Sequence, residues 1–341
     1  MINQYFDYDA VTNSPTWYKS SGLIGTGYIL WHTFHKKYWY LEDLKKLPWW
    51  EKAEKIFLIG QEANMFYNRH DDRVYMMDGQ VDLGQPRYYH YFWWFDATRK
   101  VDNMTNFSHR LTDPRVNTPE YTFDCIMGNP RPHRQVIYET VTKSKWHNKV
   151  AMSYNAANSL TQIQGSSDLP CPVTEWLPGW DDSDILHDGT PLNTADLTCT
   201  LVQYKKGIDY PFTVFLPYAL LNRSWFSILA ETRHQQTFFT EKTGKVLLGK
   251  KLFVFVGAQH ALKELQIAGY KTFDGIIDES YDSEPNEQTR WKKALEQVDF
   301  IMNQDPMKIY EEALPILEHN YNHLKFVDHE QVACEVIKSW I

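Results

Sequence analysis

Short apolar runs alternating with amphipathic segments dominate the hydrophobic pattern of this chain. The runs at residues 55–60 ("KIFLIG"), 121–127 ("YTFDCIM") and 252–257 ("LFVFVG") lead into polar or glycine-containing loops. Runs of this length, bounded by turn residues, are typical of buried strands. A helical period covers residues 287–326 and is interrupted near Pro306, which predicts two helices. Strands that alternate with helices predict an α/β fold with mainly parallel sheets.

Three further segments carry local signals. Residues 21–34 ("SGLIGTGYILWHTF") predict a glycine-rich turn that leads into a helix. The aromatic run at residues 88–100 ("YYHYFWWFDATRK") predicts either a strand or a binding wall. Residues 251–273 predict a strand, a turn at Gly257, a helix and a stop at Gly269.

The length, aromatic content and net charge of the chain bear on its domain number and its ligands. The 341 residues exceed what one ordinary core requires and predict two domains. The chain has 13 Trp, 21 Tyr and 18 Phe, and such rings either build cores or stack on sugars and bases. The net charge of −8 disfavours a large nonspecific nucleic-acid surface, because phosphate affinity depends on clustered Lys and Arg.

Cysteine and histidine spacing indicates neither a disulfide framework nor a metal site. The four cysteines are scattered and form no CxxC pair, which predicts buried thiols in a reducing compartment: Cys125, Cys171, Cys199 and Cys334. The thirteen histidines show no HExxH motif and no clustered Cys/His spacing. No signal-peptide pattern opens the sequence, and no apolar run approaches the roughly 20 residues that cross a bilayer. The sequence therefore predicts a cytoplasmic protein without a membrane partner.

Two loops are placed where open parallel sheets bind ligands, beyond strand ends and beside helix N-termini. The "GTG" at Gly25 to Gly27 allows close approach of a ligand or forms a plain tight turn, and it does not match GxGxxG. The loop at residues 128–134 ("GNPRPHR") carries three basic side chains next to a helix start: Arg131, His133 and Arg134. This loop predicts either a diphosphate site or a loop held by Arg–carboxylate pairs.

A third candidate is the charged stretch in front of the last apolar run. Glu231 and Glu241 are each able to accept hydrogen bonds from a vicinal diol, such as that of ribose. Lys242 and Lys245 are able to bind phosphate, and Thr243 is predicted to begin a helix whose positive end faces an anion. The alternative is a solvated surface helix, which explains the charges but not the "FF" pair between the acidic residues.

Residues 238–282 ("FFTEKTGKVLLGKKLFVFVGAQHALKELQIAGYKTFDGIIDESYD") resemble the donor-binding half of GT-B glycosyltransferases. The resemblance is to fucosyltransferase-like and phage-encoded members, through the "TEKT-x-K", "LxxLxxxGYKTF" and "DESYD" motifs. The loop at 128–134 and the "SYN" at 153–155 are similar to the start of that domain, so about half of the chain is covered. The chain departs from the pattern at "KKLF", where many relatives carry an "xPF" turn.

The resemblance implies a GT-B fold, in which two Rossmann-like domains with mainly parallel sheets face a central cleft. Residues 1–120 would form the acceptor-binding domain and residues 121–315 the nucleotide-sugar-binding domain. A C-terminal helix within 316–341 would pack back on the first domain. The implied donor is a nucleotide sugar, with a UDP-sugar favoured. No metal or other cofactor is obligatory, because basic residues and helix N-termini neutralise the diphosphate.

The resemblance also assigns residues. Glu241 would bind ribose or sugar hydroxyls, and Lys242 and Arg131 would bind the diphosphate. The other donor-binding residues are Gly25, Gly27, His133, Arg134, Tyr154, Glu231, Thr240, Thr243 and Lys245. A base must deprotonate the acceptor hydroxyl, and the candidates are Asp96, Glu62 and His32. Asp96 has an alternative role as the N-cap of a helix before "ATRK".

The resemblance to phage-encoded members also implies an acceptor for the transferred sugar. The resemblance implies double-stranded DNA that carries 5-hydroxymethylcytosine and receives a glucosyl or arabinosyl group, in the cytoplasm of the host. The aromatic residues 88–95 would stack on an extruded base, whereas the net charge of −8 argues against a DNA partner. The alternatives are a fucosyltransferase-like enzyme acting on a glycan and a noncatalytic nucleotide-sugar-binding protein.

Overall fold

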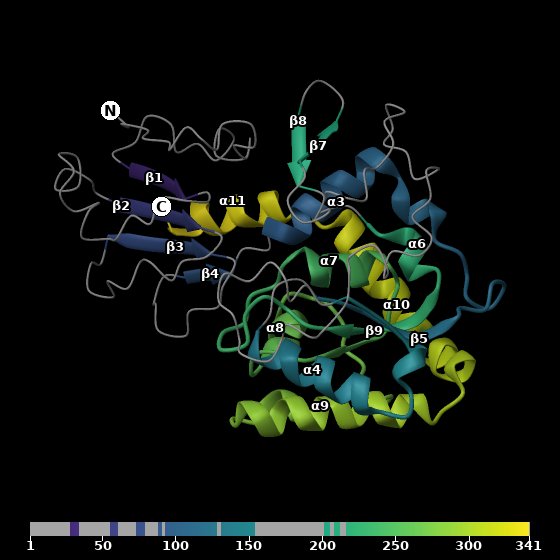
Figure 1. The fold of residues 1–341 in the computed structure, drawn as a ribbon. Coiled ribbons are helices and arrows are strands. Elements are labelled where there is room, and N and C mark those ends of the chain that lie inside the picture. Colours follow the sequence, from purple (N-terminus) through teal and green to yellow (C-terminus); the bar gives the residue numbers. More distant parts are fainter. Residues whose placement is uncertain are drawn as a thin grey trace. The chain divides into compact units, whose positions relative to one another are not determined.

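The computed structural model describes the following residues: 28–33, 55–60, 73–78, 88–90, 93–127, 131–153, 201–204, 208–211 and 216–340. The chain divides into two compact units, Met1–Asp96 with Val327–Ile341, and Ala97–Phe326. Each unit contains a four-stranded parallel sheet, so the predicted α/β class with parallel sheets is confirmed (Figure 1). The predicted domain limits at residues 120 and 315 stay a prediction.

The sheet of the first unit has the strand order β1-β2-β3-β4. Its strands are β1 (Tyr28–Thr33), β2 (Lys55–Gly60), β3 (Val74–Asp78) and β4 (Tyr88–His90). The prediction of a helix within residues 21–34 is wrong, because residues 28–33 form the strand β1. The branched and aromatic residues of β1 pair in parallel with β2 along the whole strand. The predicted strand at β2 is confirmed. Helix α11 (His329–Trp340) belongs to the same unit.

The aromatic run at residues 88–100 is mainly helical. Among the described residues of this run, only β4 is extended, and α3 (Trp93–Thr105) begins three residues after it. Phe95 is fully buried, with its ring centroid 6.2 Å from that of His329, so this ring is part of a core. Asp96 lies in the first turn of α3 and not at its N-cap. The N-cap alternative is therefore wrong, although a carboxylate in the first turn still complements the helix dipole.

The sheet of the second unit has the order β10-β9-β5-β6, and all its pairs are parallel. The strands are β5 (Tyr121–Ile126), β6 (Val150–Ser153), β9 (Ser224–Leu229) and β10 (Phe253–Phe255). The chain runs outward from β5 to β6 and then returns to β9 on the other side of β5. The winding direction therefore reverses between β5 and β9. This reversal is the topological switch point of a doubly wound sheet, where ligands bind beyond the strand ends.

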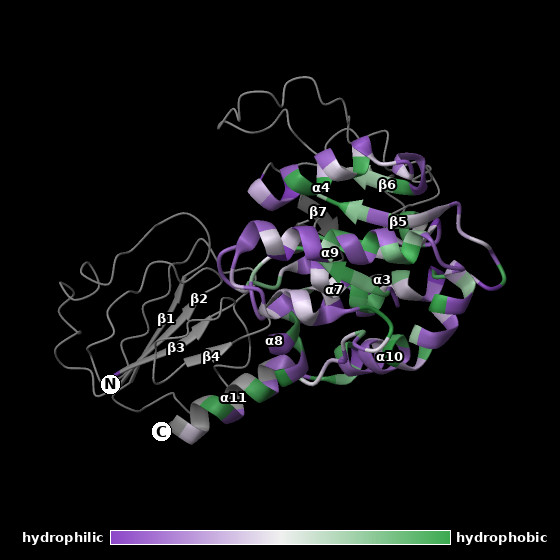
Figure 2. Ribbon diagram, turned by 90° about the horizontal axis from the view of Figure 1, so that it is seen from below, coloured by the Kyte–Doolittle hydropathy of each residue, from purple (hydrophilic) through white to green (hydrophobic). Residues whose placement is uncertain are grey.

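Helices cover both faces of this sheet. Helix α4 (Pro132–Lys143) lies beside α9 (Glu287–Met302), whereas α7 (Glu241–Leu248) lies against β9 and beside α10 (Pro306–Phe326). Figure 1 shows these two pairs on opposite sides of the strands. Figure 2 shows hydrophobic residues along the strands and hydrophilic residues on the outer turns of α9.

The remaining elements of the second unit are short. They are the antiparallel pair β7 (Leu201–Tyr204) and β8 (Ile208–Pro211), the helices α6 (Tyr218–Leu221) and α8 (Ala261–Ile267), and the 3-10 helices η3 (Phe107–Arg110), η4 (His147–Lys149) and η7 (Glu279–Ser283).

Local signals of the second unit are largely confirmed. Strand β5 is followed by α4, and strand β10 is followed by α8, as predicted. Gly269 has φ 89° just after α8. Glycine adopts this left-handed conformation without the steric penalty of a side chain, and the conformation ends the helix. Pro306 begins α10, which explains the predicted interruption. Helix α7 begins at Glu241 with Thr240 as its N-cap, two residues before the predicted start at Thr243.

Apolar packing stabilises the sheet of the second unit, and one close helix contact positions α7. Phe123 of β5 and Phe226 of β9 are fully buried, with ring centroids 5.6 Å apart. Burial of each such side chain contributes about 1.5–3 kcal/mol. Gly244 of α7 faces Thr98 of α3, whose Oγ1 would lie 3.1 Å from a Cβ at this position. The glycine therefore lets α3 approach the first turns of α7.

A buried polar group links the middle of β5 to the start and middle of β9. Asp124, which is 1% exposed, accepts hydrogen bonds from Ser224 Oγ (2.6 Å) and Ser227 Oγ (3.0 Å). The Lys251 ammonium group donates to the carbonyls of Leu221 and Ser224. Burial raises the pKa of Asp124, and it lowers that of Lys251 to about 8 despite the opposing attraction of Asp124. This group lies in the core, away from the switch point.

Candidate functional site

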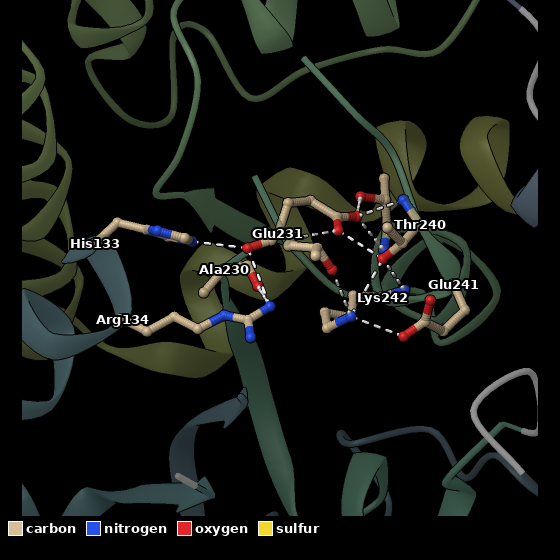
Figure 3. Close-up of polar contacts among 9 residues, drawn as sticks. His133, Arg134, Ala230, Glu231, Thr240, Glu241 and Lys242 are labelled. Atoms are coloured by element: carbon tan, nitrogen blue, oxygen red, sulfur yellow. Dashed lines mark hydrogen bonds and ion pairs between the residues drawn. The ribbon is translucent and has the colours of Figure 1, made fainter. Parts of the chain in front are cut away.

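The predicted basic loop and the predicted acidic stretch meet at the carboxyl end of β9. His133 Nε2 donates to the carbonyl of Glu231 at 2.7 Å. Arg134 Nη2 donates to the carbonyls of Ala230 (3.2 Å) and Glu231 (3.1 Å), as Figure 3 shows. Both side chains are buried, and both come from the first turn of α4. The start of α4 is thus fixed to the strand end at the switch point.

His133 is held as a neutral ring. Burial, and secondarily the charge of Arg134, lowers the pKa of His133 to about 3. Because a carbonyl only accepts, the proton sits on Nε2 and Nδ1 keeps a lone pair. Among the residues the structure describes, this Nδ1 has no hydrogen-bond partner. His133 therefore supports the strand end without adding a charge.

The carboxylate of Glu231 is an anchor for the start of α7. It is fully buried and accepts from Thr240 N (2.8 Å), Thr243 N (3.3 Å) and Thr243 Oγ1 (2.5 Å) on Oε1. Its Oε2 accepts from Thr232 N (3.1 Å) and Thr240 Oγ1 (2.5 Å). A carboxylate at a helix N-terminus is favourable for both charge and hydrogen bonding. This geometry gives the two predicted threonines and Glu231 a positioning role in the fold.

Glu241 and Lys242 form a half-buried ion pair beside this anchor. Lys242 Nζ lies 2.7 Å from Glu241 Oε1, and their side chains are 13% and 10% exposed. The same ammonium group makes longer contacts with Thr240 Oγ1 (3.3 Å) and Thr232 Oγ1 (3.4 Å). Burial by itself raises the pKa of Glu241, but the nearby lysines outweigh burial and the net pKa is lowered. Glu241 is therefore an ionised carboxylate at neutral pH.

Lys245 lies one helical turn after Glu241 and is 7% exposed. Within the described part of the chain, its ammonium group makes no hydrogen bond and no ion pair. Burial lowers its pKa to about 8, against the attraction of Glu241. A neighbouring anion favours the charged form of a lysine that burial disfavours, so this position is suited to binding an anion.

Together the predicted residues carry more positive than negative charge. Four cations (Arg131, Arg134, Lys242 and Lys245) stand against two carboxylates (Glu231 and Glu241), which leaves two positive charges in excess. Arg131 is exposed and is the residue that precedes α4. The arrangement is suited to binding a polyanion at the switch point.

Other predicted residues are not placed in this cluster. Gly25, Gly27, Glu62 and Tyr154 lie outside the described residues. His32 lies in β1, where the backbone alone is described. Asp96 is 2% exposed and belongs to the first unit. The roles predicted for these residues stay predictions.

Three supporting residues were not predicted from the sequence. His234 Nδ1 lies 3.1 Å from Glu287 Oε1, and the His234 ring lies 5.3 Å from that of Trp291. Both rings also flank His133, at 5.4 Å and 5.9 Å between centroids. Glu287 and Trp291 belong to α9, more than fifty residues after His234. No local pattern links positions so far apart, although the histidine itself stands within the charged stretch.

The fold and the cluster define an α/β protein with a cationic site at the switch point of a doubly wound sheet. No family model matches the chain, and no curated protein matches it. No group of His, Cys, Asp or Glu side chains in the described ranges is placed to hold a metal ion. None of the helices described here is both long and apolar enough to cross a membrane.

Proposed function

We propose that this chain is a GT-B glycosyltransferase that moves a sugar from a nucleoside-diphosphate donor, with a UDP-sugar favoured, to an acceptor hydroxyl. The observation that carries this proposal is Lys245, a residue only 7% exposed whose ammonium group has no partner among the described residues and lies at the switch point. The resemblance of residues 238–282 to donor-binding domains supports the same assignment.

The diphosphate belongs beside the two lysines of α7. Lys242 and Lys245 supply positive charge on one side, and Arg131 supplies it from the start of α4. Negative charge grows on the diphosphate as the glycosidic bond breaks, so fixed cations stabilise the transition state more than the ground state. The N-terminal amides of α7 already bond Glu231, so the lysine side chains carry this task.

The ribose or the transferred sugar belongs beside Glu241. Lys242 binds Oε1 of this carboxylate, and we assign Oε2 to a hydroxyl group of the donor. The lowered pKa of Glu241 keeps the group ionised and able to accept such a bond. Glu231 acts through the backbone, because it holds Thr240 and the first turn of α7 in position.

The acceptor is proposed from the resemblance alone. Phage-encoded members point to 5-hydroxymethylcytosine in double-stranded DNA, with a glucosyl or arabinosyl group transferred. Asp96, Glu62 and His32 remain the candidates for the base that deprotonates the acceptor hydroxyl. The GT-B arrangement would require both units, with the acceptor bound by the first.

Ligand-induced thermal stabilisation tests the donor site. UDP-, GDP- and dTDP-sugars are added to the full chain, and UDP-sugars are expected to raise Tm by about 2–8 °C at saturating concentration. The Glu241→Ala variant should keep its fold and lose this response. If none of these nucleotide sugars raises Tm, the donor-site proposal is wrong.

A labelled donor identifies the acceptor. Hydroxymethylated DNA, unmodified DNA and an oligosaccharide mixture are offered in parallel, and label is expected on the hydroxymethylated DNA alone. Label on the oligosaccharides instead would identify a glycan-directed transferase. Donor binding without label on any acceptor would favour a noncatalytic nucleotide-sugar-binding protein.

A further inference from the structure

The second unit contains a polar cavity at the end of its sheet opposite to the switch point. The cavity has a volume of about 360 Å³, within the range of small-molecule sites. Its wall includes Pro119 and Ser224, which precede or begin β5 and β9. Strand β9 has six residues and spans about 20 Å, so this cavity is separate from the cluster around Glu231.

Tyr310 of α10 gives this cavity a hydroxyl group that has no partner among the described residues. The residue is 6% exposed, lines the cavity, and packs its ring against Trp225 with 6.0 Å between centroids. Its hydroxyl makes no hydrogen bond with any residue that the structure describes. Burial raises its pKa to about 12, so the group is a neutral donor and acceptor. A neutral hydroxyl that is open to the cavity is able to donate to and accept from a polar ligand.

Two ion pairs form the more exposed part of the wall. Arg115 Nη2 lies 2.5 Å from Asp113 Oδ2, and Lys250 Nζ lies 2.8 Å from Glu318 Oε1. Each pair places a hydrogen-bond donor next to an acceptor, and the two cations balance the two carboxylates. The Lys250 ammonium group also lies 4.5 Å from the ring centroid of Tyr321, which lines the same cavity.

We propose that this cavity binds a neutral carbohydrate, as a noncatalytic site separate from the donor site. A vicinal diol presents a donor and an acceptor side by side, which matches each ion pair of the wall. Tyr310 and Tyr321 both line the cavity, and their phenol hydroxyls add donors and acceptors to the wall. Lys251 also lines the cavity, and the nearby buried Asp124 attracts its charge, so the wall has a weaker preference for an anion than the cluster at the switch point. This inference does not depend on the proposed transferase activity.

Titration of the full chain with small sugars tests the site. Glucose, galactose, N-acetylglucosamine and maltose are each added up to about 50 mM and followed by saturation-transfer NMR and calorimetry. At least one is expected to bind with a dissociation constant on the order of 1–10 mM, because a single small site makes few contacts with a sugar. Inorganic phosphate and glucose 6-phosphate serve as anionic probes.

Two variants locate the binding. Tyr310→Phe removes only the hydroxyl and should weaken sugar binding about tenfold, and Glu318→Gln should weaken it several-fold. Tyr138→Phe on α4 is the matched control and should bind as the native chain does. Lys245→Met should also bind sugar normally, which separates this site from the donor site.

Several results would overturn the proposal. These are the absence of binding by all four sugars, binding of phosphate without binding of neutral sugars, and unchanged affinity in both cavity variants. Circular dichroism and Tm confirm that each variant is folded. Because Glu318→Gln changes an exposed pair, it keeps the test decisive even if Tyr310→Phe disturbs the core.

Discussion

Two buried charges near the switch point, Glu231 and Lys245, have opposite surroundings. Glu231 is surrounded by hydrogen-bond donors of its own chain, whereas Lys245 has none of its chain's acceptors within the described residues. Removal of a partner from a paired buried charge destabilises the fold, and a largely buried charge without a partner costs stability unless a ligand completes it. The sequence placed both residues in one charged stretch but did not distinguish these roles, because the distinction depends on Thr240 and Thr243 folding back onto Glu231.

Replacement of Lys245 by Met should weaken nucleotide binding and raise the free energy of unfolding of the ligand-free protein. Loss of this cation from the proposed diphosphate site should reduce UDP affinity at pH 7 by about 10- to 100-fold. The folded-state pKa of Lys245 lies near 8, below its value in the unfolded chain, so the cost of its charge is fully present at pH 7. Between about pH 8 and 10.5, Lys245 is protonated to a greater extent in the unfolded chain than in the folded one. The free energy of unfolding of the native protein therefore rises over that interval. Lys245→Met should therefore be more stable at pH 7, by about 1–3 kcal/mol.

Calorimetry with UDP and urea unfolding across pH 7–9.5 measure both effects. Native affinity should fall as pH rises through about 8, because the ammonium form binds the anion, and the variant should lack this change. Lys263→Met, at an exposed position of α8, is the control and should alter neither quantity. Equal UDP affinity in the native chain and Lys245→Met would contradict the assignment.

At the scale of elements, α7 depends on a side chain outside its own sequence. Local signals predicted a helix here, and Thr240 caps its start. The strand β9 fixes that start in space, because Glu231 lies two residues after the strand and bonds the first turn of the helix. The same kind of long-range effect overrode the local signal of β1, where pairing with β2 decided the structure.

Glu231→Gln should loosen this junction. The amide keeps the shape but turns an NH₂ group toward N–H and O–H donors, and it removes the charge that complements the helix dipole. We expect a loss of about 2–3 kcal/mol in the free energy of unfolding by urea. Glu139→Gln replaces an exposed carboxylate on α4 and should change stability by less than about 0.5 kcal/mol. Similar stabilities for the two variants would show that Glu231 is not an anchor.

At the scale of the whole molecule, the α/β class and the parallel sheets followed from the alternation of apolar runs and helical periods. The order β10-β9-β5-β6 did not follow, because nothing in the local pattern of β9 specifies that it returns beside β5. That order brings the loop at 131–134 to the end of β9, so it also creates the candidate site. The cavity beside Tyr310 was not predicted either, since its wall comes from five separate segments of the chain: 108–115, Pro119, 221–224, 249–251 and 310–321.

Every described contact of the candidate site lies within the second unit, so a fragment of residues 93–326 should bind nucleotide by itself. Starting at Trp93 keeps α3 whole, and with it the Thr98 that packs on α7. The unit has its own buried core, and such a unit is expected to unfold cooperatively. We expect UDP affinity within about threefold of the full chain, and no sugar transfer, because the proposed acceptor domain is missing. The same fragment with Lys245→Met should lose this affinity. A folded fragment that does not bind UDP would show that the first unit contributes essential donor contacts, and a fragment without cooperative unfolding would contradict the independence of its core.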